Sequence, residues 1–259
     1  VIFVLLCLNF NVFCTTSIKN VDQLNEASKH SYDSNKYETA LLLSRKALKL
    51  ARASGYKSGE LKALVTIGDI YNQQDDNKKA INTYENAIII AKIIENDDQL
   101  AYCYKEKGIC NKALSKYSHS ITDFNQAIHL YKKANDLKEI AKIEYQIATI
   151  YKDQKKTEDA LRLYYKSLAV IVKTEEYDFI VTLKNSIGEV LKGEKQWDQA
   201  IGYLNEAADL AKREKKDDLL ADSLTLLAGT YEGKKDFKTS EKYYKKAIEI
   251  LQNIKDEYR

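Results

Sequence analysis

Histidine, the side chain that most often serves as acid, base or metal ligand near neutral pH, occurs three times, at positions 30, 119 and 129. These spacings match no metal-binding pattern, and His119 and His129 fall on the outward side of a predicted helix. The sequence also lacks G-x-S-x-G, P-loop, H-E-x-x-H and C-x-x-C motifs. We therefore predict that the chain is not an enzyme and binds neither a metal nor a cofactor.

The spacing of the cysteines also gives no indication of a reactive site. Cys103 and Cys110 lie seven residues apart, so on a helix they are separated by about 10 Å along the axis, beyond disulfide reach. Small or apolar residues occupy the positions 40 residues before and after each of them. We predict that both thiols serve packing.

Paired acidic residues occur at 75–76 and 217–218, and Asn or Asp fills the connectors 96–98 and 135–136. Such side chains accept hydrogen bonds from the free N–H groups of a helix's first turn. We predict that these residues cap helices rather than act as general acids.

The composition favours an all-α protein. The 259 residues include no Pro and only nine Gly, whereas helix-forming residues are abundant. The 41 basic and 38 acidic residues nearly balance, which argues against direct binding of nucleic acid, because phosphate recognition needs a concentrated basic surface.

An apolar segment opens the chain. Residues 1–14 are apolar apart from two Asn, and they are too few to span a bilayer, which takes about 20 residues. With no Met at position 1, residues 1–16 resemble the apolar part of a signal peptide that has lost its charged start. We predict export to the periplasm or cell envelope. A lipidated Cys14 and a buried first helix are the alternatives.

A period of 40 residues organises the rest of the chain. At three positions per unit every residue is Gly, Ala or Ser, which are small enough for helices whose axes lie 8–10 Å apart. This pattern predicts six units of two helices: 21–60, 61–100, 101–140, 141–180, 181–220 and 221–259. The eighteen small residues are Ser28, Gly68, Gly108, Ala148, Gly188, Ala228, Ala40, Ala80, Ser120, Ala160, Ala200, Ser240, Ala47, Ala87, Ala127, Ser167, Ala207 and Ala247.

The second unit resembles the tetratricopeptide repeat (TPR) family. The residues that carry the resemblance are Leu64, Ile67, Gly68, Tyr71, Ala80, Tyr84 and Ala87. The resemblance implies an all-α, right-handed α-solenoid of antiparallel helix pairs, a TPR-like superhelix. Two departures are the period, 40 rather than the usual 34, and the absence of the Pro that commonly ends the second helix.

The resemblance also implies a concave groove that binds a protein or peptide and is lined by the first helix of each unit. The implied groove positions in the second unit are Lys62, Val65, Asp69 and Asn72. The Lys/Asn clamp of the heat-shock co-chaperones is not supported, since Ile109 follows Lys105 and Asp69 follows Val65 at the required spacing. Two aromatic residues among several lysines predict a site for an extended acidic or aromatic peptide. The candidate residues are Tyr102, Lys105, Ile109, Lys112, Lys142, Tyr145 and Asn185.

The third unit is irregular. Lys107 occupies a position that is Ile or Leu in the other central units, and Asn111 replaces a Tyr. Either the lysine stem lies on the core with its ammonium in solvent, or the unit is loosened locally into a binding or hinge site.

These features predict a non-catalytic scaffold exported to the cell envelope, with membrane contact only through the N-terminal segment or a further C-terminal module. The alternative is the extracytoplasmic sensory region of a membrane-bound histidine kinase or transcriptional regulator. The absence of a polar capping helix before Arg259 fits that alternative. A cytosolic peptide-pheromone receptor is a third possibility, which the apolar N-terminal segment disfavours.

Overall fold

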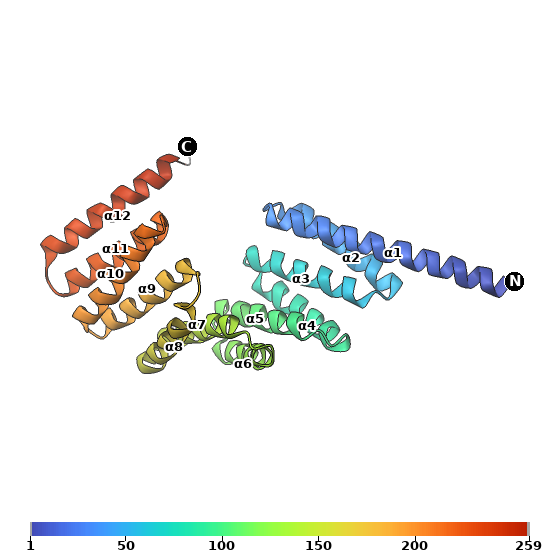
Figure 1. Ribbon diagram of the computed structural model, residues 1–259, viewed down its shortest axis with the longest axis horizontal. Coiled ribbons are helices and arrows are strands. Elements are labelled where there is room, and N and C mark those ends of the chain that lie inside the picture. The colour runs from blue at the N-terminus through green and yellow to red at the C-terminus, as the bar shows by residue number, and fades with distance from the viewer. Residues whose placement is uncertain (1, 258–259) are drawn as a thin grey trace. The chain divides into compact units, whose positions relative to one another are not determined.

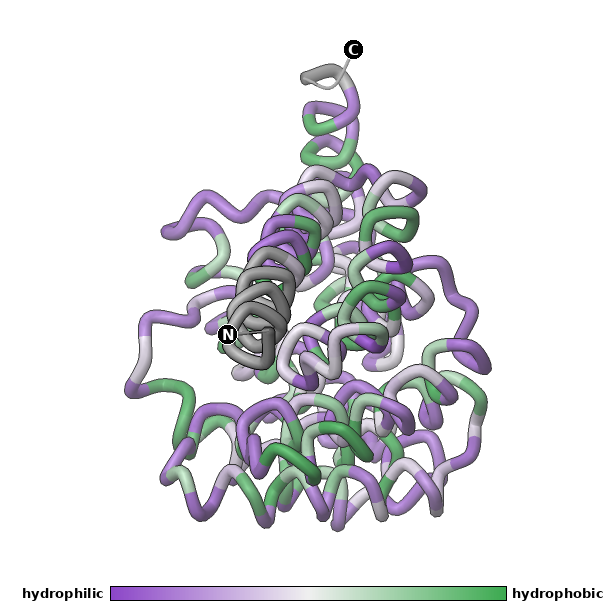
Figure 2. Tube along the Cα trace, turned by 90° about the vertical axis from the view of Figure 1, so that its right-hand side faces the viewer, coloured by the Kyte–Doolittle hydropathy of each residue, from purple (hydrophilic) through white to green (hydrophobic). Residues whose placement is uncertain are grey.

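The computed structural model describes the backbone of residues 2–257 and the side chains of residues 17–255. Every element in this part of the chain is a helix (Figure 1). The helices are α1 (Ile2–Asp33), α2 (Tyr37–Ser54), α3 (Lys57–Gln73), α4 (Asn77–Ile93), α5 (Asp97–Ala113), α6 (Tyr117–Lys133), α7 (Leu137–Asp153), α8 (Thr157–Ile171), α9 (Tyr177–Gly193), α10 (Trp197–Arg213), α11 (Asp217–Gly233) and α12 (Phe237–Glu257). Hydrophobic and hydrophilic stretches both occur along the helices that Figure 2 shows in colour, as amphipathic packing requires.

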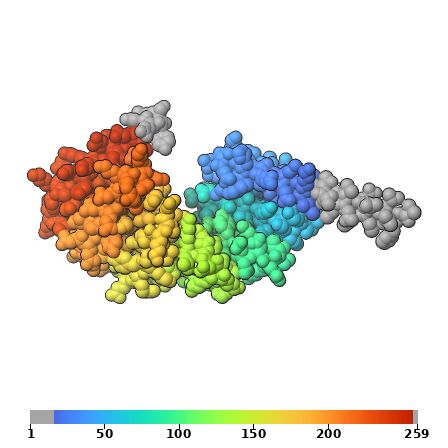
Figure 3. All heavy atoms as spheres, in the orientation of Figure 1, coloured from blue at the N-terminus to red at the C-terminus, as the bar shows by residue number. Residues whose placement is uncertain are grey.

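The chain divides into two compact units, Val1–Asn135 and Asp136–Arg259, each described here by itself. In each unit a helix packs against the one that follows it, and neighbouring first helices also touch: α1 with α3, α3 with α5, and α9 with α11. Within either unit the surface follows chain order from one helix to the next (Figure 3). The six helix pairs correspond to the six predicted repeats, and second helices begin every 40 residues from Tyr37 onward.

Helix α1 begins at Ile2, so no helix end marks the boundary predicted after residue 16. The side chains of residues 1–16 lie outside the described residues, and the signal-peptide interpretation stays a prediction. Within the residues whose side chains are described, no helix is both long enough and apolar enough to cross a membrane.

All eighteen small residues of the repeat are buried, as the period of 40 predicts. A Cβ atom added to Gly68 would lie 2.6 Å from the Tyr84 ring, and one added to Gly108 would lie 2.7 Å from the Phe124 ring. At Gly188 the corresponding contact, with Leu204, would be 2.5 Å. These glycines allow the large residue of the second helix to press against the backbone of the first.

The connectors confirm most of the predicted caps. Asp76, Asn96 and Asp136 accept hydrogen bonds from backbone N–H groups in the first turns of α4, α5 and α7. The prediction for residues 217–218 is wrong, because Lys216 occupies the cap position without a side-chain bond and the two aspartates lie in the first turn of α11. There the negative charges are favoured by the partial positive charge of the helix N-terminus.

Repeat three contains a polar cluster in its core. The Lys107 side chain is only 16% exposed, and its Nζ lies 3.3 Å from Asp123 Oδ1 and 3.4 Å from Glu85 Oε1. Asn111 Nδ2 donates to Asp123 Oδ2 at 2.8 Å. The ammonium is therefore held between two carboxylates rather than released into open solvent. Burial raises the pKa of Asp123, against the opposing effect of Lys107.

Candidate functional site

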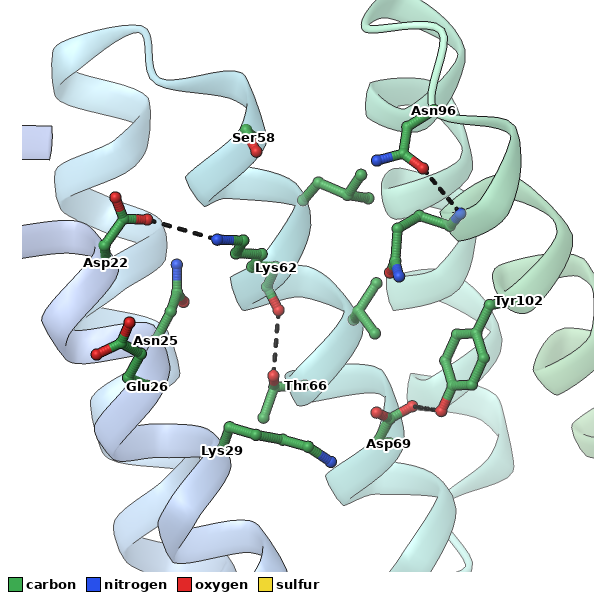
Figure 4. A pocket seen from close by; sticks show the side chains of 13 residues that line it. Asp22, Asn25, Glu26, Lys29, Ser58, Lys62, Thr66, Asp69, Asn96 and Tyr102 are labelled. Carbon is green, nitrogen blue, oxygen red and sulfur yellow. Dashed lines mark hydrogen bonds and ion pairs between the residues drawn. The ribbon is translucent and has the colours of Figure 1, made fainter.

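A pocket of about 550 Å³ lies between the first helices of the three repeats of the first unit, α1, α3 and α5 (Figure 4). Its volume is within the range of about 300–1,000 Å³ typical of ligand sites. It exists because first helices of successive repeats pack side by side, so the same helical face recurs three times around one opening. The lining residues are Asp22, Asn25, Glu26, Lys29, Ser58, Leu61, Lys62, Val65, Thr66, Asp69, Asn96, Gln99 and Tyr102.

Asp69 lines the pocket and is only 9% exposed. Its Oδ1 accepts two hydrogen bonds, from Tyr84 Oη at 2.7 Å and Tyr102 Oη at 3.0 Å. Burial raises the pKa of Asp69, while the two tyrosine hydroxyls oppose that rise by stabilising the carboxylate. Burial together with the Asp69 charge also raises the pKa of Tyr84 and that of Tyr102, so both remain hydrogen-bond donors.

The second oxygen of the Asp69 carboxylate, Oδ2, accepts no hydrogen bond from residues 17–255, and no cation of that range lies within 4.0 Å of either oxygen. Lys29 extends toward Asp69 from α1 in Figure 4, but its ion pair is with Asp33 at 2.9 Å. Lys62 is held by Asp22, 3.7 Å away on the facing helix. Both lysines of the pocket thus have acidic partners other than Asp69.

Asn25 forms part of the α1 wall and is 6% exposed. Its Nδ2 donates to the carbonyl oxygen of Gly59 at 3.1 Å, which fixes the orientation of the amide. Its Oδ1 is the one buried side-chain polar atom without a hydrogen-bond partner in the part of the chain whose side chains are described. The α5 wall adds the amide of Asn96, whose Oδ1 accepts from the Gln99 backbone N–H at 3.0 Å.

This arrangement suits non-covalent binding. Leu61 and Val65 give the pocket an apolar side, and the polar groups around them are amides, carboxylates and lysines held by other contacts. Within residues 17–255 no group of three or more His, Cys, Asp or Glu is placed to hold a metal ion.

Four of the predicted site residues lie on α5 in the first unit. Tyr102 lines the pocket, and its hydroxyl is engaged with Asp69 rather than exposed for a ligand. Lys105 Nζ lies 5.1 Å from the centre of the Tyr102 ring and 3.5 Å from Glu106. Ile109 and Lys112 are half-buried on the same helix, outside the pocket lining.

The other three belong to the second unit. Lys142 Nζ forms ion pairs with Glu139 and Glu176, both at 3.2 Å. The Tyr145 ring packs against Phe179 at 5.3 Å and Tyr164 at 5.5 Å. Since the two units are described separately, a single site that combines both groups stays a prediction.

Asn185 is 8% exposed and accepts a hydrogen bond from Ser223 at 2.9 Å. It lines a smaller pocket of about 310 Å³ between α9 and α11, together with Thr182 and Glu189 of the same helix. Three of the implied groove positions of the second repeat, Lys62, Val65 and Asp69, also line the larger pocket.

The α1 wall is absent from the groove positions predicted from the sequence, none of which lies in the first repeat. A signal was present, since moving back 40 residues from Lys62, Val65 and Asp69 reaches Asp22, Asn25 and Lys29. All three line the pocket.

Family comparisons agree with this architecture. Two tetratricopeptide repeat models match the chain, one over residues 178–253 and one over residues 61–92. The chain thus contains tetratricopeptide repeats. A comparison with curated protein sequences found no match.

Solved structures of other TPR-like proteins share the fold. BtubC (BKLC) from P. vanneervenii aligns with a TM-score of 0.70 and 17% identity, over 91% of this chain and 92% of that one. A Rap protein complexed with competence and sporulation factor aligns with a TM-score of 0.64 and 15% identity, over 92% and 66%. The signal transduction ATPase with a tetratricopeptide repeat sensor from Pyrococcus horikoshii aligns with a TM-score of 0.78 and 15% identity. The alignment covers 94% of this chain and 37% of that one. The all-α class and the helical solenoid are thereby confirmed.

Proposed function

We propose that this TPR array is a non-catalytic scaffold that binds a protein or peptide on the first-helix face of its repeats. The observation that carries the proposal is the pocket between α1, α3 and α5, whose walls include Asn25 Oδ1, a buried acceptor without a donor among the described residues. A buried acceptor without a donor costs free energy that a bound partner recovers. The Rap protein complexed with competence and sporulation factor supports ligand binding by such a fold.

The predicted site residues belong to the proposal in each unit separately. Lys105, Ile109 and Lys112 lie on α5 with the pocket-lining Tyr102 and would contact the parts of a ligand that extend beyond the pocket. Lys142, Tyr145 and Asn185 lie on first helices of the second unit, where they would form contacts of their own.

Binding is tested with an array of random-sequence peptides applied to the full chain. The larger side chain of Val65→Trp fills the pocket, so this variant should bind the retained peptides with at least tenfold lower affinity. Ile89→Trp is the matched control, because Ile89 is 56% exposed on α4, away from the pocket. Helix content by circular dichroism must be equal in both variants. If Val65→Trp and the control bind alike, this pocket is not the binding site.

Export to the cell envelope is the second part of the proposal, and the apolar residues 1–14 support it. Cell fractionation with N-terminal sequencing of the native protein tests it. A processed N-terminus in the envelope fraction is expected, and an intact N-terminus in the cytosol would remove this part.

A sensory region is the alternative function. It is favoured by the likeness to the ATPase whose tetratricopeptide repeats are named as its sensor. The gene sequence after codon 259 distinguishes the two. An apolar span of about 20 residues and an output module would favour the sensor, and a polar capping helix would favour the scaffold.

A further inference from the structure

The pocket between α1, α3 and α5 contains hydrogen-bond acceptors that lack donors. Asp69 Oδ2 and Asn25 Oδ1 have no partner among residues 17–255, and both residues are more than nine-tenths buried. Nearly all buried polar atoms in proteins have a partner, so the unpartnered Asn25 Oδ1 in the wall of this pocket requires an explanation. A ligand that carries hydrogen-bond donors would satisfy Asn25 Oδ1 and give Asp69 Oδ2 a partner.

The charges of the lining residues also favour a ligand group that donates hydrogen bonds, and they favour a positively charged one. The lining contains three carboxylates, Asp22, Glu26 and Asp69, and two lysines. Lys62 is paired with Asp22, and Lys29 is paired with Asp33, which is outside the lining. Asp69 is the most buried carboxylate and has no cation within ion-pair distance in the described residues. A buried carboxylate without a counter-ion is unfavourable, and a cation supplied by a ligand would relieve this cost.

Shape supports a long cationic side chain. Leu61 and Val65 line the same pocket as Asp69, so an aliphatic stem can lie against them while its charged end reaches the carboxylate. Tyr84 and Tyr102 both donate to Oδ1 of this carboxylate, which leaves Oδ2 for the ligand. Asn96 and Gln99 provide amides at the α5 wall for the backbone of an extended peptide.

We propose that this pocket binds the protonated amine or guanidinium of a lysine or arginine side chain in a peptide ligand, with Asp69 as its counter-ion. The inference rests on the proposed function and specifies the ligand chemistry of that site. It differs from the sequence-based prediction, in which lysines of the chain hold an acidic or aromatic peptide.

The test uses the full chain and an array of random-sequence decapeptides with acetylated and amidated ends. Retained peptides should share a Lys or Arg at one position, and replacing it with Gln or citrulline should weaken binding at least tenfold. Asp69→Asn should weaken binding of the parent peptide by the same factor. The altered peptide should bind Asp69→Asn no more weakly than either change alone makes it bind. Additive losses would show that the cation binds elsewhere and would overturn the inference.

Two control variants separate this proposal from its alternatives. Asp75→Asn removes the same charge from an exposed turn of the same repeat, at a left-handed position that Asn tolerates, and should change affinity less than twofold. Lys29→Gln removes the pocket lysine that extends toward Asp69 (Figure 4) and should leave binding unchanged or strengthened. A tenfold loss in Lys29→Gln would indicate an anionic ligand group and would overturn the proposal.

A cross-linking measurement does not depend on the folding of any variant. Retained peptides are resynthesised with a diazirine-bearing lysine analogue at the shared cationic position and photolysed on the unaltered chain. Adducts within residues 22–29, 58–69 or 96–102 are expected, and adducts confined to other segments would contradict the assignment. Peptides that bind without any cation overturn this inference alone, whereas the absence of any retained peptide overturns the proposed function as well.

Discussion

Tyr102 on α5 donates a hydrogen bond from its hydroxyl to Asp69 Oδ1 on α3, with the oxygens 3.0 Å apart. This bond joins the first helices of the second and third repeats at the pocket. Tyr84, from the second helix of its own repeat, donates to the same oxygen. Asp69 therefore links packing within a repeat to packing between repeats.

Removal of the Tyr102 hydroxyl should destabilise the first unit. A hydrogen bond to a charged acceptor contributes about 1.5–3 kcal/mol, and Tyr84 retains part of the stabilisation, so Tyr102→Phe should lower the free energy of unfolding by about 1–2 kcal/mol. Urea unfolding measures the change. Tyr104→Phe is the control, because no hydrogen bond of the Tyr104 hydroxyl occurs among the described residues. Equal losses in both variants would contradict a specific role for the bond to Asp69.

The pH dependence of stability should reflect the raised pKa of Asp69, whose main cause is burial. A carboxyl whose pKa is higher in the folded state than in the unfolded state binds more protons when folded, so it gains stability as the pH falls. Relative to Asp69→Asn, which cannot titrate, the unaltered chain should gain stability between pH 7 and pH 4. Unfolding free energies at several pH values test this. A difference that is constant or shrinks over that range would contradict the sign of the shift.

Two glycines in helices should respond oppositely to substitution by alanine. The added methyl of Gly68→Ala would lie 2.6 Å from the Tyr84 ring, so the variant should lose about 1–3 kcal/mol of stability through overpacking. Gly202 lies in α10 with no described atom within 4 Å of an added Cβ, so Gly202→Ala should gain about 0.5–1 kcal/mol. Thermal or urea unfolding measures both. A neutral or stabilising Gly68→Ala would mean that the helix pair is not closely packed there.

The two central cysteines should be unreactive in the folded chain. Cys103 and Cys110 are fully buried, and burial raises the pKa of each thiol to about 12. Because the thiolate is the reactive form, labelling at pH 8 should be slower than in denaturant by at least a hundredfold. The measurement uses the full chain with Cys7→Ser and Cys14→Ser, so that only these two thiols react. Rapid labelling under native conditions would reveal local opening of α5.

The sequence alone determined the repeat architecture. Small residues every 40 positions were sufficient, because two helices can approach closely only where side chains are small. The buried positions of Gly68, Gly108 and Gly188 follow from this single pattern. The caps at Asp76, Asn96 and Asp136 also followed from sequence, since a cap depends on residues within one turn of one helix.

Only the tertiary structure decided the chemistry of the pocket. The sequence could place Asp69 and Tyr102 on the same face of successive first helices, but not reveal that they share a hydrogen bond or that Lys29 pairs with Asp33 instead. It also could not show that Lys107 is held by Asp123. Side-chain partners depend on the distance and rotation between helices, which a periodic pattern leaves undefined. The period of the sequence thus fixes which residues face one another, and three-dimensional packing decides which of them remain available to a ligand.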